Sequence, residues 1–502
     1  MLLVELDGSE RGGTYFGFSL MSGSNDSTIK GLAVNSFDNS DALHIESENT
    51  KIQGNFIGTN ISATSAKPNG VGLNGTGGSS FGENALIGGL SPEDRNIISG
   101  NSVGTTATGS YPSNGWIIQG NYIGLGANGV TQIGNSSPPP LGPGALSIGR
   151  NSGVVVGGPQ VGATNVISGN KSFGIFPDDT TGLVIQGNII GSDWKGDAIA
   201  NPQQVGGIGM PALYGPFVDT LIGGMNSGEG NVISHNNGTG IAVIAGSFNG
   251  NPFSPTENIS ILGNSIHSNL ANNTGYVPFE PGLGIDLLAA EFSDNSSSTT
   301  GPTPNDPSDS DTGPNHFINF PVLNSVEQNG STASINFNLD AADGENDQYR
   351  VEFFSNDTPD PSGYGEGQTF LGATTVTNGN SQIANLTLPS GTNLADKSIS
   401  ATTTAIDSNA TSGFGSTSEF SQIVTATQVL TPSPEPTIPT STPTSSTSNP
   451  TPITNLASTG DNLKLLFLIA SLLLLGGLGM LAKKHLPRTK SYNKKIKNTK
   501  KK

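Results

Sequence analysis

Short apolar segments recur along the first 290 residues, and each ends at a glycine or an asparagine. The string IQGNFIG begins at Ile52, IQGNYIG at Ile118 and IQGNIIG at Ile185, and a divergent copy, ILGNSIH, begins at Ile261. Their asparagines are Asn55, Asn121, Asn188 and Asn264. The separations between them are 66, 67 and 76 residues, so the chain contains an internal repeat.

A second set of strings follows the same period. NIISGN begins at Asn96, NVISGN at Asn165 and NVISHN at Asn231. The apolar segments are too short for helices, and no 3.6-residue period appears before the C-terminal region. Strands this short are stable only when they stack on copies of themselves, so the pattern predicts a solenoid of β-strands.

Stacking brings equivalent residues of successive coils together. We expect the isoleucines to stack inside the solenoid, and Asn55, Asn121 and Asn188 to point inward. In that position their amides form ladders, in which each side chain bonds the next along the axis. A structural role of this kind, rather than a catalytic one, is our interpretation of these asparagines.

These strings resemble those of the bacterial right-handed parallel β-helix repeat proteins, in the pectate-lyase-like superfamily. The resemblance covers residues 4 to 288, within a predicted domain of residues 1–290. It implies a right-handed coil of a little over twenty residues, so each 66-residue unit would hold about three coils. The scaffold hosts lyases, hydrolases, epimerases and adhesins, so the resemblance leaves the function open.

The repeats stop after Leu288, and an acidic polar connector is predicted over residues 291–315. Alternation with a period of two then returns, in SINFNL from Ser334 and YRVEFF from Tyr349. Such runs over about a hundred residues predict a β-sandwich across residues 316–427. The strings YRVEFF, GYGEGQTFLG and TSEFS resemble those of immunoglobulin- or fibronectin-type modules. The folded part is therefore predicted to be all-β.

The C-terminal region predicts a surface anchor. Residues 428–455 are rich in Pro, Ser and Thr and predict a disordered, extended spacer. Residues 465–481 form an apolar run long enough for one transmembrane helix, and a basic tail follows it. Positive residues favour the cytoplasmic side, so the repeats are expected outside the cell.

The pentapeptide before this run resembles a Gram-positive-type cell-wall sorting signal. Its residues are Leu456, Ala457, Ser458, Thr459 and Gly460, with alanine where proline is usual. The resemblance implies a sortase-like transpeptidase as a partner, with cleavage between Thr459 and Gly460, and places the sorting signal over residues 456–502. A plain membrane anchor without cleavage is the alternative, and in both cases the tail is cytoplasmic.

Charge and composition exclude some classes of binding partner and some kinds of chemistry. Residues 1–460 carry 10 basic and 38 acidic residues, a net charge of −28, which argues against a nucleic-acid partner. The chain has no cysteine, which excludes disulfides and thiol chemistry. The first residues read as a strand and a turn rather than a signal peptide, so we expect further coils to precede residue 1.

Candidate chemistry is sparse. Asp306, Asp309 and Asp311 alternate ahead of a glycine, a pattern that offers oxygen ligands to calcium, the one cofactor the sequence suggests. The alternative is a solvated acidic linker. The adjacent Asp178 and Asp179 are the candidate catalytic carboxylates.

The string GSDWKGD offers another surface for a sugar ring. Trp194 could stack on the ring, and Asp193 and Asp197 could form hydrogen bonds with its hydroxyl groups. A loop aromatic half packed on the coil is the alternative that we favour.

Three functions remain open. The first is a non-enzymatic surface protein, an adhesin or a protein that contacts an extracellular glycan or the surface of a host or neighbouring cell. The second is a surface polysaccharide lyase or glycoside hydrolase. The third is a structural protein of an envelope layer.

Overall fold

The computed structural model describes most of the chain up to residue 429. The described ranges are 4–10, 13–75, 82–107, 114–136, 144–200, 203–248, 251–252, 254–270, 282–291, 301–342 and 344–429. The predicted spacer beyond residue 429, the sorting pentapeptide and the apolar run at 465–481 lie outside these ranges. Among the described residues, no helix has the length and apolar character needed to cross a membrane.

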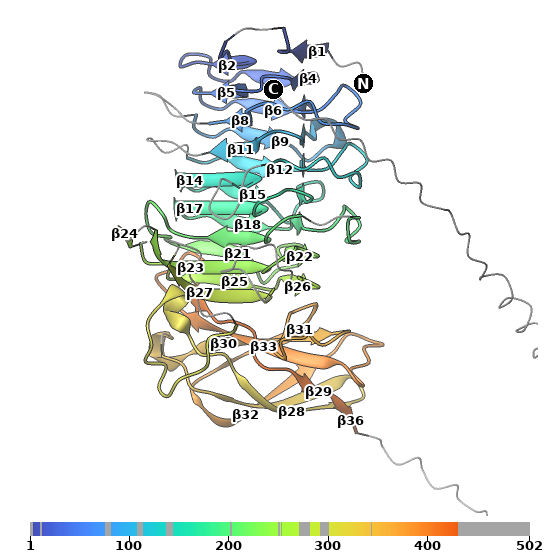
Figure 1. Cartoon of the computed structure of the whole chain (residues 1–502). Coiled ribbons are helices and arrows are strands. Elements are labelled where there is room, and N and C mark those ends of the chain that lie inside the picture. Colours follow the sequence, from blue (N-terminus) through green and yellow to red (C-terminus); the bar gives the residue numbers. More distant parts are fainter. Residues whose placement is uncertain are drawn as a thin grey trace, which may run out of the picture. The chain divides into compact units, whose positions relative to one another are not determined.

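Three sheets of short parallel strands form a parallel β-helix (Figure 1). Sheet A contains, in order, β1 (Val4–Asp7), β4 (Leu32–Asn35), β7 (Phe56–Ile57), β10 (Ile97–Ile98), β13 (Tyr122–Ile123), β16 (Val166–Ile167), β19 (Ile189–Ile190), β22 (Val232–Ser234) and β26 (Ser265–His267). Sheet C contains β3 (Thr28–Lys30), β6 (Lys51–Gln53), β9 (Leu86–Gly88), β12 (Ile117–Gln119), β15 (Val155–Gly157), β18 (Val184–Gln186), β21 (Thr220–Gly223) and β25 (Ile259–Leu262).

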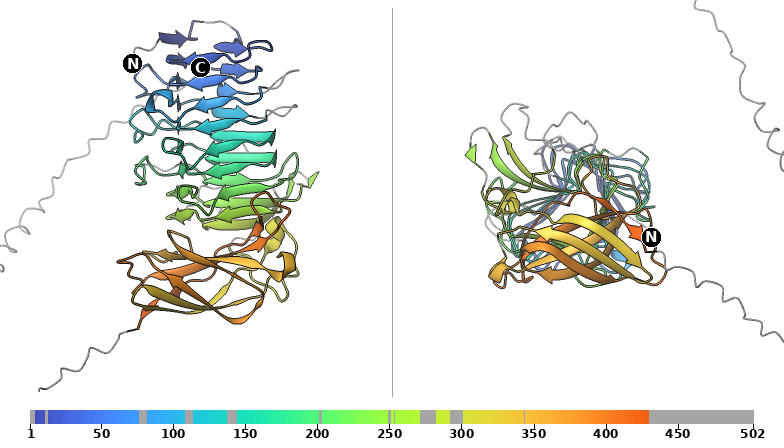
Figure 2. Two further views of the ribbon diagram at one scale, coloured as in Figure 1. Left: turned by 180° about the vertical axis from the view of Figure 1, so that it is seen from behind. Right: turned by 90° about the horizontal axis from the view of Figure 1, so that it is seen from below.

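Sheet B completes the coil and carries the longest strands. It contains β2 (Phe18–Leu20), β5 (Asp41–Ile45), β8 (Val71–Asn74), β11 (Val103–Ala107), β14 (Leu146–Ser152), β17 (Ile175–Thr181), β20 (Ile208–Met210), β23 (Ile241–Phe248), and both β24 (Asn251–Pro252) and β27 (Ile285–Glu291), which pair with β23. Each strand in the three sheets is followed in the next coil by its counterpart, and the same succession is visible from behind (Figure 2).

Isoleucines stack in register through the core. One column runs through Ile57, Ile98, Ile123, Ile167, Ile190, Ile233 and Ile266, all at most 1% exposed. Burying such a side chain contributes roughly 1.5–3 kcal/mol. The repeat of an isoleucine at this position therefore specifies both the fold and its register.

The predicted inward position of the repeat asparagines is confirmed. Asn55, Asn121 and Asn188 are at most 1% exposed. They belong to one ladder of side-chain amides, which runs through Asn55, Asn96, Asn121, Asn165, Asn188, Asn231 and Asn264 with N···O distances of 2.8–3.2 Å. A second ladder runs through Asn69, Asn101, Asn135, Asn170, Gln204, Asn236 and Asn269.

The expectation of three coils per repeat is wrong, because each 66-residue unit holds two. Successive members of the first ladder are 41, 25, 44, 23 and 43 residues apart, so long and short coils alternate. The long coils contain small hairpins closed by the bridges Thr59–Ala66, Leu125–Gln132 and Ser192–Ala198. These residues leave the coil after sheet A and return to it, so they lengthen the repeat without adding a coil.

Two further sheets follow the β-helix, and they are called the sandwich below (residues 318–429). One sheet has the order β32 (Gly379–Thr387), β29 (Thr332–Leu339), β28 (Val322–Asn329) and β36 (Thr427–Gln428). The other has the order β31 (Thr369–Val376), β30 (Tyr349–Asn356), β33 (Ser398–Ile406) and β34 (Phe414–Thr417), with β35 (Val424–Thr425) on β33.

The two sheets of the sandwich share an apolar core. Phe337 of β29 and Phe353 of β30 are both fully buried, and their ring centroids lie 5.5 Å apart. Helical structure in the described residues consists of short 3-10 turns, η1 (Pro92–Asp94), η3 (Pro314–Phe317) and η4 (Glu345–Asp347). The described part of the chain is thus nearly all β.

Candidate functional site

The two candidate catalytic carboxylates lie on β17 of sheet B. The side chain of Asp178 is buried, at 5% exposure, and its Oδ1 accepts a hydrogen bond from the backbone N–H of Tyr214 at 3.1 Å. Burial first, and the nearby charge of Asp179 to a smaller extent, raise the pKa of Asp178 to about 6. Asp179 has a φ of +52°, which turns the strand at this point.

Two residues that the sequence did not single out as site residues complete this group. Arg150 lies on β14, which pairs with β17 so that Gly149 is opposite Asp178. The guanidinium of Arg150 lies 4.7 Å from the ring centroid of Tyr214, and this tyrosine is 69% exposed. We call Arg150, Asp178, Asp179 and Tyr214 the Asp178 cluster.

The repeat pattern of the sequence indicates one contact of this cluster, that between the positions of Arg150 and Asp179. Arg150 has a φ of +55°, as Asp179 has +52°, and both precede a glycine turn that leads into sheet C. The strings GRNSGVV and DDTTGLV are therefore equivalent, and their alignment places Arg150 beside Asp179. Tyr214 comes from a segment between β20 and β21 that has no repeated counterpart, so the pattern gave no signal for it.

The Asp178 cluster offers the elements of acid–base chemistry on a sheet surface. A carboxyl group with a pKa near 6 can give or take a proton close to neutral pH. Asp179 and Arg150 add opposite charges beside it. An exposed tyrosine ring gives a flat apolar face next to these charges.

The three aspartates of the acidic segment lie close together. One carboxylate oxygen from each of Asp306, Asp309 and Asp311 lies within 4.8 Å of the others. Burial, with the charge of Asp306 second, raises the pKa of Asp311. Oδ1 of Asp311 is buried without a hydrogen-bond partner among the described residues. Hard oxygen donors and an unsatisfied carboxylate atom fit a calcium ion.

Protein groups already use most of the other oxygens. Asp309 accepts the backbone N–H of Asn319 at 2.9 Å and that of Ala342 at 2.7 Å. Asp306 accepts the hydroxyl of Ser310 at 2.6 Å. A cation here would share these oxygens with the backbone, which lowers the affinity that the group offers.

The tryptophan of GSDWKGD is half exposed, at 47%. Its backbone N–H bonds the carbonyl of Gly129 in the hairpin of an earlier long coil, at 3.3 Å. Asp193 is buried and accepts the backbone N–H groups of Lys195 and Asp197, at 2.8 and 3.0 Å. This carboxylate holds its own turn, and Trp194 leaves part of its ring at the surface.

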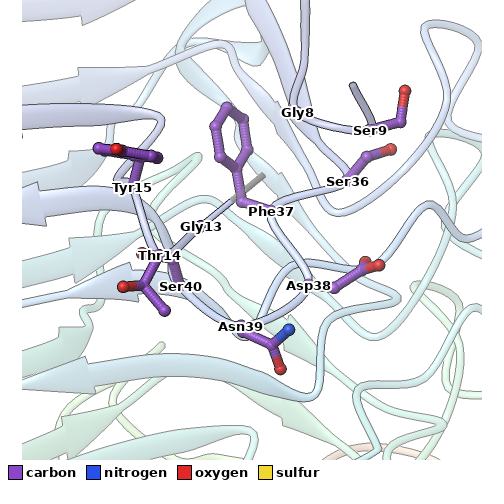
Figure 3. Close-up of a pocket in the computed structure, with 10 residues that line it drawn as sticks. All are labelled: Gly8, Ser9, Gly13, Thr14, Tyr15, Ser36, Phe37, Asp38, Asn39 and Ser40. Carbon is purple, nitrogen blue, oxygen red and sulfur yellow. The ribbon is translucent and has the colours of Figure 1, made fainter. Parts of the chain in front are cut away.

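A hollow of about 300 Å³ lies between the loops of the first two coils. Its lining residues are Gly8, Ser9, Gly13, Thr14, Tyr15, Ser36, Phe37, Asp38, Asn39 and Ser40 (Figure 3). The ring of Tyr15 is 57% exposed, whereas Phe37 is buried. Residues with hydroxyl, amide and carboxylate groups thus line the same hollow as an exposed aromatic residue. The loops around this hollow contain no repeated string, so the sequence pattern contains no signal for it.

No family model matches the chain, and a search of curated proteins found no match.

Proposed function

We propose that this chain is a cell-surface protein that contacts extracellular glycans without cleaving them. The observation that supports the proposal most directly is the hollow beside Tyr15, whose size suits one sugar unit. Sugar rings stack on aromatic faces, and their hydroxyls exchange hydrogen bonds with side chains such as Asp38, Asn39 and Thr14.

The scaffold supports this role through its rigidity. The buried amide ladders and the isoleucine columns fix the loops of neighbouring coils relative to one another. A preformed site loses little conformational freedom when it binds, so shallow contacts suffice for useful affinity. The predicted spacer and sorting signal at the C-terminus would hold the β-helix outside the cell, where glycans are found.

A binding experiment tests this proposal. The purified protein is titrated with neutral and acidic oligosaccharides on an array, and hits are measured by calorimetry. We expect Tyr15→Ala to weaken binding about tenfold or more, because the stacking face is lost. Tyr214→Ala is the matched control, since it removes another exposed tyrosine. Binding that survives Tyr15→Ala and is lost in Tyr214→Ala would move the site to the Asp178 cluster.

A second candidate function is a polysaccharide lyase or glycoside hydrolase that acts at the Asp178 cluster. The observation that favours it is the pKa of about 6 for Asp178, next to Asp179 and Arg150. Incubation with pectic, alginate-like and host-type glycans, with and without calcium, would reveal turnover. Turnover that disappears in Asp178→Ala or Asp179→Ala would establish the enzyme and replace the binding proposal.

A further inference from the structure

Three glutamates of the sandwich accept hydrogen bonds from the last coil of the β-helix. Glu352 of β30 accepts the backbone N–H of Gly263 at 2.8 Å. Glu366, between β30 and β31, accepts those of Ser268 at 2.6 Å and Asn269 at 3.0 Å. Glu419, after β34, accepts that of Leu287 at 2.9 Å. All three glutamates are at most 8% exposed.

These contacts reach every sheet of the coil. Gly263 directly follows β25 of sheet C, Ser268 follows β26 of sheet A, and Leu287 lies in β27 of sheet B. In the preceding coil, Gly224 is the counterpart of Gly263 and donates its backbone N–H to the carbonyl of Leu262 in the next coil. Asn236, the counterpart of Asn269, likewise donates its backbone N–H to Oδ1 of Asn269. The glutamates therefore replace a further coil as hydrogen-bond acceptors, and an edge that would otherwise be open is satisfied.

The second amide ladder also ends on the sandwich. The side-chain amide of Asn269 donates to Oε1 of Glu366 at 3.2 Å. Phe354 and Phe420 of the sandwich are buried within the same apolar core as Ile261, Ile266 and Ile285 of the β-helix. The two parts are thus docked by shared core packing as well as by polar contacts.

The junction concentrates carboxyl groups where solvent is excluded. Asp286 of β27 is 2% exposed and lies close enough to Glu419 for the two groups to interact electrostatically. The negative charge of Asp360 likewise disfavours the ionised form of Glu366 and so raises its pKa. Arg350 brings a positive charge to this group, and its Nε lies 2.9 Å from Oε1 of Glu352. Two adjacent carboxyl groups with full burial cannot both ionise without a large cost.

Burial is the main cause of the altered proton affinity of these groups. It raises the pKa of Glu366 to about 7, and it also raises the pKa values of Asp286 and Glu352. Burial, together with the charge of Asp286, raises the pKa of Glu419 well above its usual range. The docked junction therefore holds protons that the same groups would lose in water at neutral pH.

We propose that this junction is a proton-controlled lock between the β-helix and the sandwich. The sandwich stays docked while the buried carboxyl groups of Asp286, Glu366 and Glu419 hold protons, and the docking weakens as they ionise. The sign follows from linkage: the docked state binds more protons than the separated state, so a rise in pH favours separation. The change extends from the ordinary carboxylate range, near pH 4, through the pKa of about 7 that Glu366 has in the docked state.

Hydrogen exchange of the full-length chain in detergent, followed by mass spectrometry, tests the lock. Exchange is compared at pH 5.0 and pH 8.5 after correction for the intrinsic effect of pH on amides. We expect protection of segments 259–269 and 285–288 to fall about tenfold or more at pH 8.5, since each unit of pKa difference is a factor of ten. The middle coils around Ile123 serve as the internal reference and should change little.

Glu419→Gln is the decisive variant, because glutamine keeps an acceptor oxygen for Leu287 but cannot ionise. It should retain protection at pH 8.5 and reduce the pH effect at the junction. Glu327→Gln on β28 is the matched control, since that glutamate is exposed. If Glu419→Gln fails to fold, Asp286→Asn makes the same test from the other side. Equal protection at both pH values in the wild type, or a pH effect unchanged in both variants, would overturn the proposal.

Discussion

The side-chain amide of Asn121 donates to Oδ1 of Asn165 at 3.0 Å, although 44 residues separate the two. This bond joins the IQGN string of one coil to the NVIS string of the next. The two sets of repeated asparagines are therefore alternate members of one ladder. Oδ1 of Asn121 in turn accepts from the backbone and the side chain of Asn96, so its removal leaves buried N–H groups of the preceding coil without an acceptor.

Asn121→Ala should destabilise the β-helix by about 2–4 kcal/mol. It removes the acceptor of two buried groups of Asn96, its backbone N–H and one of its side-chain N–H groups, at a cost of about 1–3 kcal/mol for each group. Urea unfolding followed by circular dichroism measures the change. Asn226→Ala is the control, because Asn226 is exposed and should change the free energy of unfolding by less than about 1 kcal/mol. Equal losses in the two variants would show that the ladder adds nothing.

The pKa of Asp178 predicts a pH-dependent stability. A folded-state pKa of about 6 lies above the ordinary value, so the folded protein binds more protons than the unfolded chain. The free energy of unfolding of the wild type should therefore fall as pH rises from about 4 to 6, by roughly 2–3 kcal/mol from this group alone.

Asp178→Asn keeps an acceptor for the N–H of Tyr214 and removes the ionisation. The stability of this variant relative to the wild type should increase as pH rises from about 4 to 6, and the difference should stay constant at higher pH. Thermal unfolding at pH 4.5 and 7.5 measures this difference. A gap between the two proteins that is the same at both pH values would place the pKa of Asp178 in its usual range.

We expect calcium to bind the group of Asp306, Asp309 and Asp311 only weakly, with a dissociation constant of about 10⁻⁴–10⁻³ M. Backbone and hydroxyl donors already occupy oxygens of Asp306 and Asp309, and an ion would have to compete with them. Calorimetry measures the affinity. A sub-micromolar value that is lost on combining Asp309→Ala with Asp311→Ala would contradict this expectation.

The sequence predicted the repeating features of the fold better than its local ones. Stacked isoleucines and asparagines recur in coil after coil, so their period predicts both the solenoid and the residues that point into its core. The coil count was wrong because the hairpin at Thr59–Ala66 and its counterparts lengthen alternate coils without a change in the repeat. Contacts that occur once leave no period, so neither the hollow beside Tyr15 nor the position of Tyr214 was predicted.

The junction between the β-helix and the sandwich was only partly predictable from the sequence. Glu352, Glu366 and Glu419 occur in YRVEFF, GYGEGQTFLG and TSEFS, the strings on which the resemblance to a surface module rests. A single acid in each of three such strings was visible in the sequence. The role of these glutamates at the junction could not be predicted, because they converge on one coil only after both parts have folded.

The predicted anchor lies outside the described residues, and its basic tail determines how we expect it to be oriented. Moving ten or more basic residues across a bilayer is strongly disfavoured, so the tail after Leu481 should remain cytoplasmic. We expect the predicted spacer to hold Thr459 and Gly460 outside the membrane in an extended form, which an enzyme groove could accept without unfolding. We expect mature protein in envelope fractions of the native host to end at Thr459, and Thr459→Ala to remain membrane-bound and detergent-extractable. Mass spectrometry of the C-terminal peptide distinguishes the two forms. Wild-type protein that is fully extracted by detergent and still carries Lys502 would exclude the transpeptidase and leave the plain transmembrane anchor.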